Sequence, residues 1–287
     1  MRKTIVSFML LGLVAAACSK EPAGEGAFSG SGREIVLGLD DSSIDMSVDT
    51  KATAITSLSG THYWGATTGT RGNTAEARKW NTATASVSSN KIATGKYQTA
   101  TPTAYNYYVS NATFTVPATG NVTMSASNTT DVYVGWVAAS NSTTPAITLN
   151  HIFARTGSLT ATAPSGFTAS NVSWKIVGTS TINGTAGTYN LSTGAWTAAS
   201  TKLSSDTAIT TSSDMYLIPG TYTITVSYTL TKGDNVQSYT KQGTVTLAAG
   251  KVNNISCTLV TTSVPEITLN LSLTAWGSQN LTLTLPS

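Results

Sequence analysis

The chain shows its clearest alternation of apolar and polar residues between residues 216 and 259. From residue 222 to residue 230 every second residue is apolar, and each residue between them is Thr or Ser. This period of two is typical of an amphipathic β-strand. The strand is predicted to turn Thr223 and Thr225 away from a core that receives Tyr222, Ile224, Val226 and Tyr228.

Two turn sequences predict that this strand is followed by two more. KGDN at 232–235 is one tight-turn sequence, and AGK at 249–251 is another. The segments after them contain apolar residues of one parity, namely Tyr239, Val245, Leu247, Ile255, Cys257 and Leu259. Three antiparallel strands in one meander cannot bury their apolar face alone, so we expect this face to pack on a second sheet.

Shorter runs predict strands along the rest of the chain. Only TAEARKW at 74–80 is predicted to be a short helix, because the remainder is too rich in Thr, Val, Gly and Asn. A polar break at 141–145 is predicted to separate two domains. The strands are expected at 35–39, 44–48, 106–110, 112–116, 122–126, 132–137, 147–153, 159–163, 172–176, 187–196, 267–273 and 281–285.

The first 18 residues have the pattern of a bacterial lipoprotein signal. Arg2 and Lys3 precede an apolar run at 5–14 that is too short to span a membrane permanently. Small residues then lead to Cys18, which we predict to be the lipidated first residue of the mature protein. Ordinary secretion with cleavage at the alanines is the alternative. Residues 19–32 are predicted to be a flexible tether. Because lipidation of Cys18 leaves Cys257 without a disulfide partner, Cys257 is predicted to be an inert core residue.

The charge balance argues against a nucleic-acid partner. Charged residues make up 10% of the chain, far below the usual value of about 25%. Loss of Arg2 and Lys3 from the 16 basic residues would leave 14 against 13 acidic ones. The basic residues form no cluster, so the electrostatic footprint for nucleic acid is missing. A Thr-rich surface instead suits β-sheets exposed outside the cell.

No residue pattern points to an enzyme. Neither histidine has a Ser, Cys or acid at a motif spacing, and His151, between Leu149 and Phe153, is predicted to be a packed structural side chain. The sequence contains no nucleophile elbow, P-loop or metal-binding histidine pair. The acidic residues at 40, 41, 45 and 49 lack the Gly and Glu of a calcium loop. We therefore predict no catalytic residue, no cofactor and no metal site.

Aromatic residues suggest one alternative role. An exposed platform of rings can bind glycans or partner proteins, and adjacent Tyr107 and Tyr108 must point to opposite faces of a strand, so that at least one belongs to the core. The residues that qualify are Trp64, Trp80, Tyr105, Tyr107, Tyr108 and Trp136.

Several short motifs follow one another in a family-like order. After the lipoprotein signal come TKAT at 50–53, LNHIFAR at 149–155, the hairpin from Tyr189 to Trp196, LAAGK at 247–251 and the terminal strand with Trp276. This order resembles the fimbrillin-like family, the type V pilus subunits of Bacteroides-type bacteria. The resemblance runs from Cys18 to the C-terminus.

The resemblance implies an all-β fold with two tandem transthyretin-like β-sandwich domains, built from Greek-key and meander antiparallel sheets. We expect a signal peptide at 1–17, a tether at 18–32, an N-terminal domain at 33–146 and a C-terminal domain at 147–287. The resemblance also implies lipoprotein export to the surface of the outer membrane and polymerisation into a fimbria. The expected partners are other pilin subunits, the outer membrane through a lipid anchor before processing, and a receptor on a host or bacterial surface.

Polymerisation in such a family implies removal of the first strand and strand exchange. The strand at 35–39, with or without 44–48, is predicted to be an edge strand that proteolysis removes. Lys51 is the predicted cut site, in place of the Arg that the family carries, and Arg33 is the runner-up because it precedes the strand. The donor is predicted to be the C-terminal strand of another subunit, whose Leu281, Leu283 and Leu285 share one face.

Two hypotheses from different classes follow. The first is a structural pilus subunit that assembles into a fibre for adhesion. The second is a monomeric surface lipoprotein that binds glycan through exposed aromatic rings.

Overall fold

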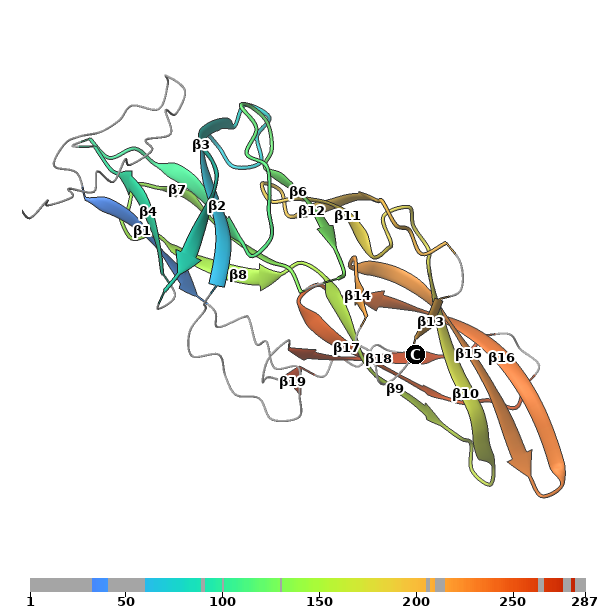
Figure 1. The fold of residues 1–287 in the computed structure, drawn as a ribbon. Coiled ribbons are helices and arrows are strands. Elements are labelled where there is room, and N and C mark those ends of the chain that lie inside the picture. The colour runs from blue at the N-terminus through green and yellow to red at the C-terminus, as the bar shows by residue number, and fades with distance from the viewer. Residues whose placement is uncertain are drawn as a thin grey trace, which may run out of the picture.

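The computed structural model describes residues 33–40, 60–88, 91–99, 101–129, 131–204, 207–209, 215–262, 266–275 and 280–281. Every helix or strand assigned among them is a β-strand, which confirms the predicted all-β class. The molecule is elongated, with the N-terminal strands at one end and a long C-terminal hairpin at the other (Figure 1).

A seven-stranded sheet forms the N-terminal end. Its spatial order is β3 (Ala77–Val87), β2 (Gly60–Thr68), β5 (Tyr105–Ser110), β7 (Tyr133–Ser140), β8 (Ala146–His151), β1 (Glu34–Asp40) and β4 (Lys91–Tyr97). β8 pairs with β1 through residues 146–148 and with β7 through residues 149–151, so it passes from one part of the sheet to the other. The outermost strands, β3 and β4, are consecutive and meet where Ser88 pairs with Lys91. The sheet therefore wraps around its own core.

This first core takes one side chain from almost every second position of the seven strands, because neighbouring side chains of a strand point to opposite faces. Its buried members are Ile35, Leu37, Leu39, Trp64, Ala66, Trp80, Val87, Ile92, Tyr105, Tyr107, Val109, Tyr133, Ile147 and Leu149. Tyr108 points the other way, into a second core. Both adjacent tyrosines are thus buried, each in a different cluster.

A three-stranded sheet in the middle of the molecule joins the two halves of the chain. Its order is β12 (Ala195–Ala199), β11 (Ala186–Asn190) and β6 (Thr123–Ser127). β6 comes from the first half of the chain and β11 from the second, and they pair over five residues, from Thr123 opposite Asn190 to Ser127 opposite Ala186. The second core includes Tyr108, Phe114, Val122, Met124, Phe153, Leu191 and Ile218.

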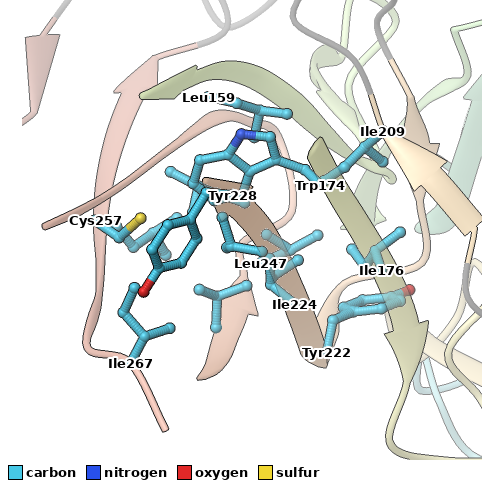
Figure 2. Packing of buried hydrophobic residues seen from close by; sticks show 14 of the residues in the cluster. Leu159, Trp174, Ile176, Ile209, Tyr222, Ile224, Tyr228, Leu247, Cys257 and Ile267 are labelled. Carbon is cyan, nitrogen blue, oxygen red and sulfur yellow. The ribbon is translucent and has the colours of Figure 1, made fainter. Parts of the chain in front are cut away.

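Two sheets packed face to face form the C-terminal end. One has the order β13 (Thr207–Ile209), β10 (Thr168–Gly178), β15 (Gly220–Lys232) and β16 (Asn235–Leu247). The other has the order β14 (Tyr216–Leu217), β9 (Ala154–Thr162), β17 (Lys251–Thr258), β18 (Leu269–Ala275) and β19 (Asn280–Leu281). Figure 2 shows the side chains that fill the space between them, among them Trp174, Tyr222, Ile224, Tyr228 and Leu247.

The predicted core face of β15 is confirmed. Tyr222, Ile224, Val226 and Tyr228 are all buried in the third core. Thr223 is half-buried, as expected of the other face. Thr225 differs from the prediction, because it is buried on the outer face of the sheet, where Gln242 donates a hydrogen bond from Nε2 to its hydroxyl at 3.3 Å.

The predicted meander of three strands is wrong at its last strand. β15 and β16 form the expected hairpin. β17, however, pairs with β9 and β18 in the opposite sheet. The turn at 249–250 therefore crosses between the sheets, and Gly250 suits it because its φ is +61° and its N–H donates to the Phe153 carbonyl at 2.9 Å. The meander was expected to pack on a second sheet, and β17, its predicted third strand, belongs to that second sheet.

Two further element predictions are wrong. Residues 74–75 form a turn and β3 begins at Ala77, so 74–80 is not a helix. Burial of Trp80 in the first core outweighs the helix propensity of TAEARKW. Residues 112–116 form only an isolated bridge at Thr115 rather than a strand. The prediction for 44–48 lies outside the described residues.

The predicted domain division between residues 146 and 147 falls at the start of β8. Because β8 is hydrogen-bonded to β7 and β1, we propose to draw the division after His151, where β9 begins in the C-terminal sandwich. Phe153 and Ala154 lie at this point and are fully buried, so the two ends of the molecule meet through packed side chains.

Candidate functional site: the slot filled by strand β1

β1 lies inside the seven-stranded sheet, between β8 and β4. Its sequence, EIVLGLD, alternates apolar residues with others, and this places Ile35, Leu37 and Leu39 on the core side. Ile35 and Leu37 are 0% exposed and Leu39 is 6% exposed. The prediction of an edge strand is therefore wrong: β4 covers the outer side of β1.

Both sides of β1 are hydrogen-bonded. On the β8 side, the N–H groups of Val36 and Gly38 donate to the carbonyls of Thr143 and Pro145 at 2.8 and 2.9 Å. The pairing continues in parallel as far as Asp40 opposite Thr148. Without β1, two rows of backbone groups and the pockets for three apolar side chains would open together.

One side chain and two backbone N–H groups of the β4 region hold the start of β1. The Thr94 hydroxyl donates to the Ile35 carbonyl at 2.7 Å, and the Gly95 N–H donates to the Glu34 carboxylate at 3.0 Å. The Gln98 N–H donates to the Arg33 carbonyl at 3.2 Å. Arg33 itself is exposed directly before the strand. A cut there would leave β1 joined to the chain that follows it.

Gly38 leaves space on the β8 side of the slot. A Cβ atom built at Gly38 would lie 3.7 Å from the Pro145 carbonyl oxygen, which is an ordinary van der Waals contact. The slot therefore accepts residues with side chains at this position as well as glycine.

Most other predicted site residues lie outside the described part of the chain. These are Cys18, Lys51, Leu283 and Leu285. Leu281 is in β19, where it pairs with Leu273 of β18. Of the predicted donor residues only Leu281 is described, and it pairs at the edge of the C-terminal sandwich rather than at the slot of its own chain.

Sequence reasoning missed a buried polar network around Glu76. Glu76 is 0% exposed, and its carboxylate accepts hydrogen bonds from the hydroxyls of Thr67 and Tyr108, from Ser192 Oγ at 2.7 Å and from Asn106 Nδ2 at 3.3 Å. All four partners donate, as an acceptor-only carboxylate requires. Glu76 lay within the segment predicted as a helix, and its partners are distant in sequence, so no local signal marked it.

The network connects the N-terminal sheet to the turn between β11 and β12. Ser192 is in that turn, and its Oγ also accepts the Val122 N–H at 2.9 Å. Arg71 donates to the Leu191 carbonyl at 2.5 Å and stacks on Trp136, with 3.3 Å from its guanidinium carbon to the ring centroid. Burial lowers the pKa of Arg71, while the nearby Tyr108, Tyr189 and Glu76 act in the opposite direction. These contacts are structural: they fix the middle sheet against β5 and β7.

The two histidines lie near each other around Tyr133. His62 Nε2 is 2.8 Å from the Tyr133 hydroxyl, and the His151 ring lies edge-on to Tyr133. His151 Nδ1 is 2.8 Å from Asp131 Oδ1. Burial lowers the pKa of His62 and raises that of Tyr133 to about 12. The prediction that His151 is a packed side chain is confirmed, since it is 4% exposed.

The aromatic residues do not form an exposed platform. Trp64, Trp80, Tyr105 and Tyr107 pack together in the first core, and Tyr108 lies in the second. Of the six residues predicted for the platform, Trp136 alone is exposed, at 42%, and Arg71 covers one of its faces. These six residues therefore do not supply the exposed aromatic platform on which a glycan-binding role was partly based.

Cys257 is buried in the third core, as predicted, and is not in a disulfide. Burial raises the pKa of its thiol to about 11, so the thiol stays protonated at neutral pH. In the described part of the chain, no three His, Cys, Asp or Glu side chains gather as a metal site would require. No helix among the described residues is long and apolar enough to cross a membrane.

The chain is thus an all-β protein in which the first described strand fills an interior slot of a sheet, with a second sandwich beyond it. No family model matches the sequence, and no curated protein matches it.

Solved structures do match. A fimbrial protein from Bacteroides vulgatus ATCC 8482 has a TM-score of 0.51 at 12% identity, covering 85% of this chain and 100% of that chain. A fimbrilin from Porphyromonas gingivalis W83 has a TM-score of 0.46 at 9% identity, covering 87% of this chain and 99% of that chain. Other matched structures are described in terms of cell adhesion. The resemblance to fimbrial proteins predicted from the sequence is confirmed at the level of the fold.

Proposed function

We propose that this protein is a structural pilus subunit, not an enzyme, and that it assembles when β1 is replaced by a strand of another subunit. The observation that carries the proposal is the position of β1, buried between β8 and β4 at the N-terminal end of the described chain. The fold shared with a fimbrial protein supports the same role.

The slot gives a replacement strand two kinds of stabilisation. Burial of three apolar side chains contributes about 1.5 to 3 kcal/mol each. Backbone hydrogen bonds to β8 and β4 contribute about 0.5 to 1.5 kcal/mol each. A strand that matches both is held firmly, whereas one that lacks the apolar spacing is not.

The C-terminal segment of another copy has the required spacing. Leu281, Leu283 and Leu285 alternate with threonines, as Ile35, Leu37 and Leu39 alternate in β1. In either strand direction the middle leucine replaces Leu37 and a threonine replaces Gly38, where a Cβ makes only ordinary contact. Leu281 pairs with Leu273 of its own sandwich, so donation requires this short pairing to open.

Export and processing complete the proposal. Cys18 would carry the lipid that anchors the subunit to the outer membrane, with the folded part exposed at the cell surface. A cut after Lys51 would free β1 from β2, whereas a cut after Arg33 would leave it attached, so Lys51 is the better site. The assembled subunits would form a fimbria that meets a receptor on a host or bacterial surface.

The test replaces residues 50–53 with the recognition sequence of a site-specific protease. Cutting should release residues up to the cut and produce ladders on gels that resist detergent but not heat. A chain ending at Gly277 should give no ladder. Leu283→Asp should shorten the ladder strongly and Thr284→Asn should not, because only the leucine enters the core.

Two outcomes count against the proposal. If cut protein stays monomeric, the β1 slot is not the assembly site. If the chain ending at Gly277 forms ladders as long as those of the full chain, the donor is a different segment. Lys51→Ala in the natural sequence, treated with the processing protease, tests the cut site separately.

A further inference from the structure

We infer that β16 is a second interaction surface, at which two copies of this chain pair edge to edge as antiparallel strands. This contact differs from strand exchange at the β1 slot in position, partner segment and symmetry. It would join subunits side by side.

Among the described strands β16 is the last of its sheet, so on one side no described strand of that sheet lies beside it. Its first residues, 235–240, pair with residues 227–232 next to the turn of the long hairpin at the C-terminal end (Figure 1). Gly233, with φ +58°, starts the two-residue turn between β15 and β16. An exposed edge of this kind presents a row of N–H and C=O groups that another strand can pair with.

The outward-facing residues of β16 follow from its pairing. In an antiparallel ladder, alternate residues direct their backbone groups toward the neighbouring strand. The Gln242 carbonyl points outward, because it accepts the Ile267 N–H at 2.9 Å. Two-residue steps from Gln242 therefore place the groups of Thr240, Ser238 and Val236 on the open side.

The stretch of β16 whose outer side is open is centred on Ser238. At one end it stops at Gln242, which residues 266–267 already cover. At the other end it stops at the turn residue Asp234. These two limits are equally far from Ser238, so a second copy turned by 180° fits the same window: Ser238 opposite Ser238 and Val236 opposite Thr240.

The side chains permit this pairing. No residue from 235 to 240 is charged, so the strand meets no like charge when it pairs with itself, and the usual protection of an edge by Lys or Pro is missing. The next residue, Lys241, points inward and donates to the Thr262 carbonyl at 2.6 Å. Val236 is 61% exposed, and a partner's Thr240 beside it would cover part of that apolar surface. The occupant that fits the edge is therefore the same edge of a second copy.

The test uses the mature chain with β1 in place and Cys18→Ala, so that neither the lipid nor strand exchange contributes. Sedimentation equilibrium should detect a concentration-dependent dimer. Ser238→Lys and Ser238→Glu should each weaken the dimer about tenfold or more, because each places like charges opposite one another. An equimolar mixture of the two variants should dimerise again. Thr221→Lys, on the same sheet face but in β15, is the matched control and should dimerise normally.

A disulfide gives a second measurement that does not depend on affinity alone. Residues directly opposite in a hydrogen-bonded antiparallel pair have Cα atoms about 5.5 Å apart, within disulfide range. Ser238→Cys should therefore cross-link to itself under mild oxidation, and Thr246→Cys should not. The inference is overturned if the protein is monomeric at every concentration, or if the two cysteine variants cross-link equally.

Discussion

Ser192 donates its hydroxyl proton to the Glu76 carboxylate at 2.7 Å, and this bond joins the second half of the chain to the loop before β3. The carboxylate is fully buried, so the hydrogen-bond donors around it must replace the water that would otherwise solvate it. The bond therefore links the turn between β11 and β12 to the residue that directly precedes β3.

Glu76→Ala is expected to lower the free energy of unfolding by about 3 to 5 kcal/mol, because three hydroxyls and one amide lose their acceptor in a buried site. Ser192→Ala should cost about 1 to 3 kcal/mol, since the carboxylate keeps its other donors. Urea denaturation measures both. Arg78→Ala, at an exposed position two residues away, is the control. Equal losses for Glu76→Ala and Arg78→Ala would contradict the assigned network.

His62 should make stability fall as the pH falls. Burial lowers the pKa of His62 in the folded protein below its value of about 6.5 in the unfolded chain. The unfolded state therefore binds more protons between the two values, and this contribution to stability is complete above pH 6.5 and is lost as the pH falls below it. Tyr133 stays neutral throughout, because its pKa is about 12. Urea denaturation at pH 7.5 and pH 5 should show a smaller pH effect in His62→Gln; an unchanged effect would assign it to another group.

Ile224→Ala is expected to destabilise the C-terminal sandwich by about 2 to 5 kcal/mol, because it leaves a cavity at a fully buried position of β15. Thr223→Ala, on the opposite face and half-buried, should cost far less. Thermal unfolding followed by circular dichroism compares them. If the two melting temperatures fall equally, the assigned faces of the strand are wrong.

Cys18 is expected to be acylated in cells that process bacterial lipoproteins. Labelling with a palmitate analogue should mark the natural sequence and leave Cys18→Ala unmarked. Cys257, buried with a thiol pKa of about 11, should stay unlabelled in both. Label on Cys18→Ala equal to that on the natural sequence would refute the assignment.

Local alternation predicted strands well where one face is buried and the other is exposed. β15 is the best example, because every second residue from Tyr222 to Leu230 is buried in the core and, of the residues between them, all but Thr225 are only half-buried. The fate of β17 was not predictable in this way, since a turn at 249–250 has the same residues whether the chain stays in its sheet or crosses to the other. TAEARKW was assigned to a helix on propensity, and only the distant partners of Trp80 and Glu76 make it a turn and a strand.

The slot was predicted in part. Residues 35–39 were predicted to form a strand, and this is what β1 is, with Ile35, Leu37 and Leu39 on its buried face. Its interior place was missed, because pairing with β8 and β4 depends on residues far along the chain. Sequence periodicity identifies which face of a strand is buried but not which strands lie beside it.

The parallel pairing of β1 with β8 also affects how the protein folds. β1 is synthesised before its partners, yet it has nothing to pair with until residues 91–97 and 143–148 have been made and ordered. Closing such long loops costs entropy before the contacts offset it, so this strand is expected to join late, after local hairpins such as β2–β3 and β15–β16. Every newly made subunit would then pass through an interval with its slot open. If subunits assemble through the slot as proposed, newly made copies would have to be kept apart until β1 has docked, because they would otherwise pair before the proposed proteolytic cut.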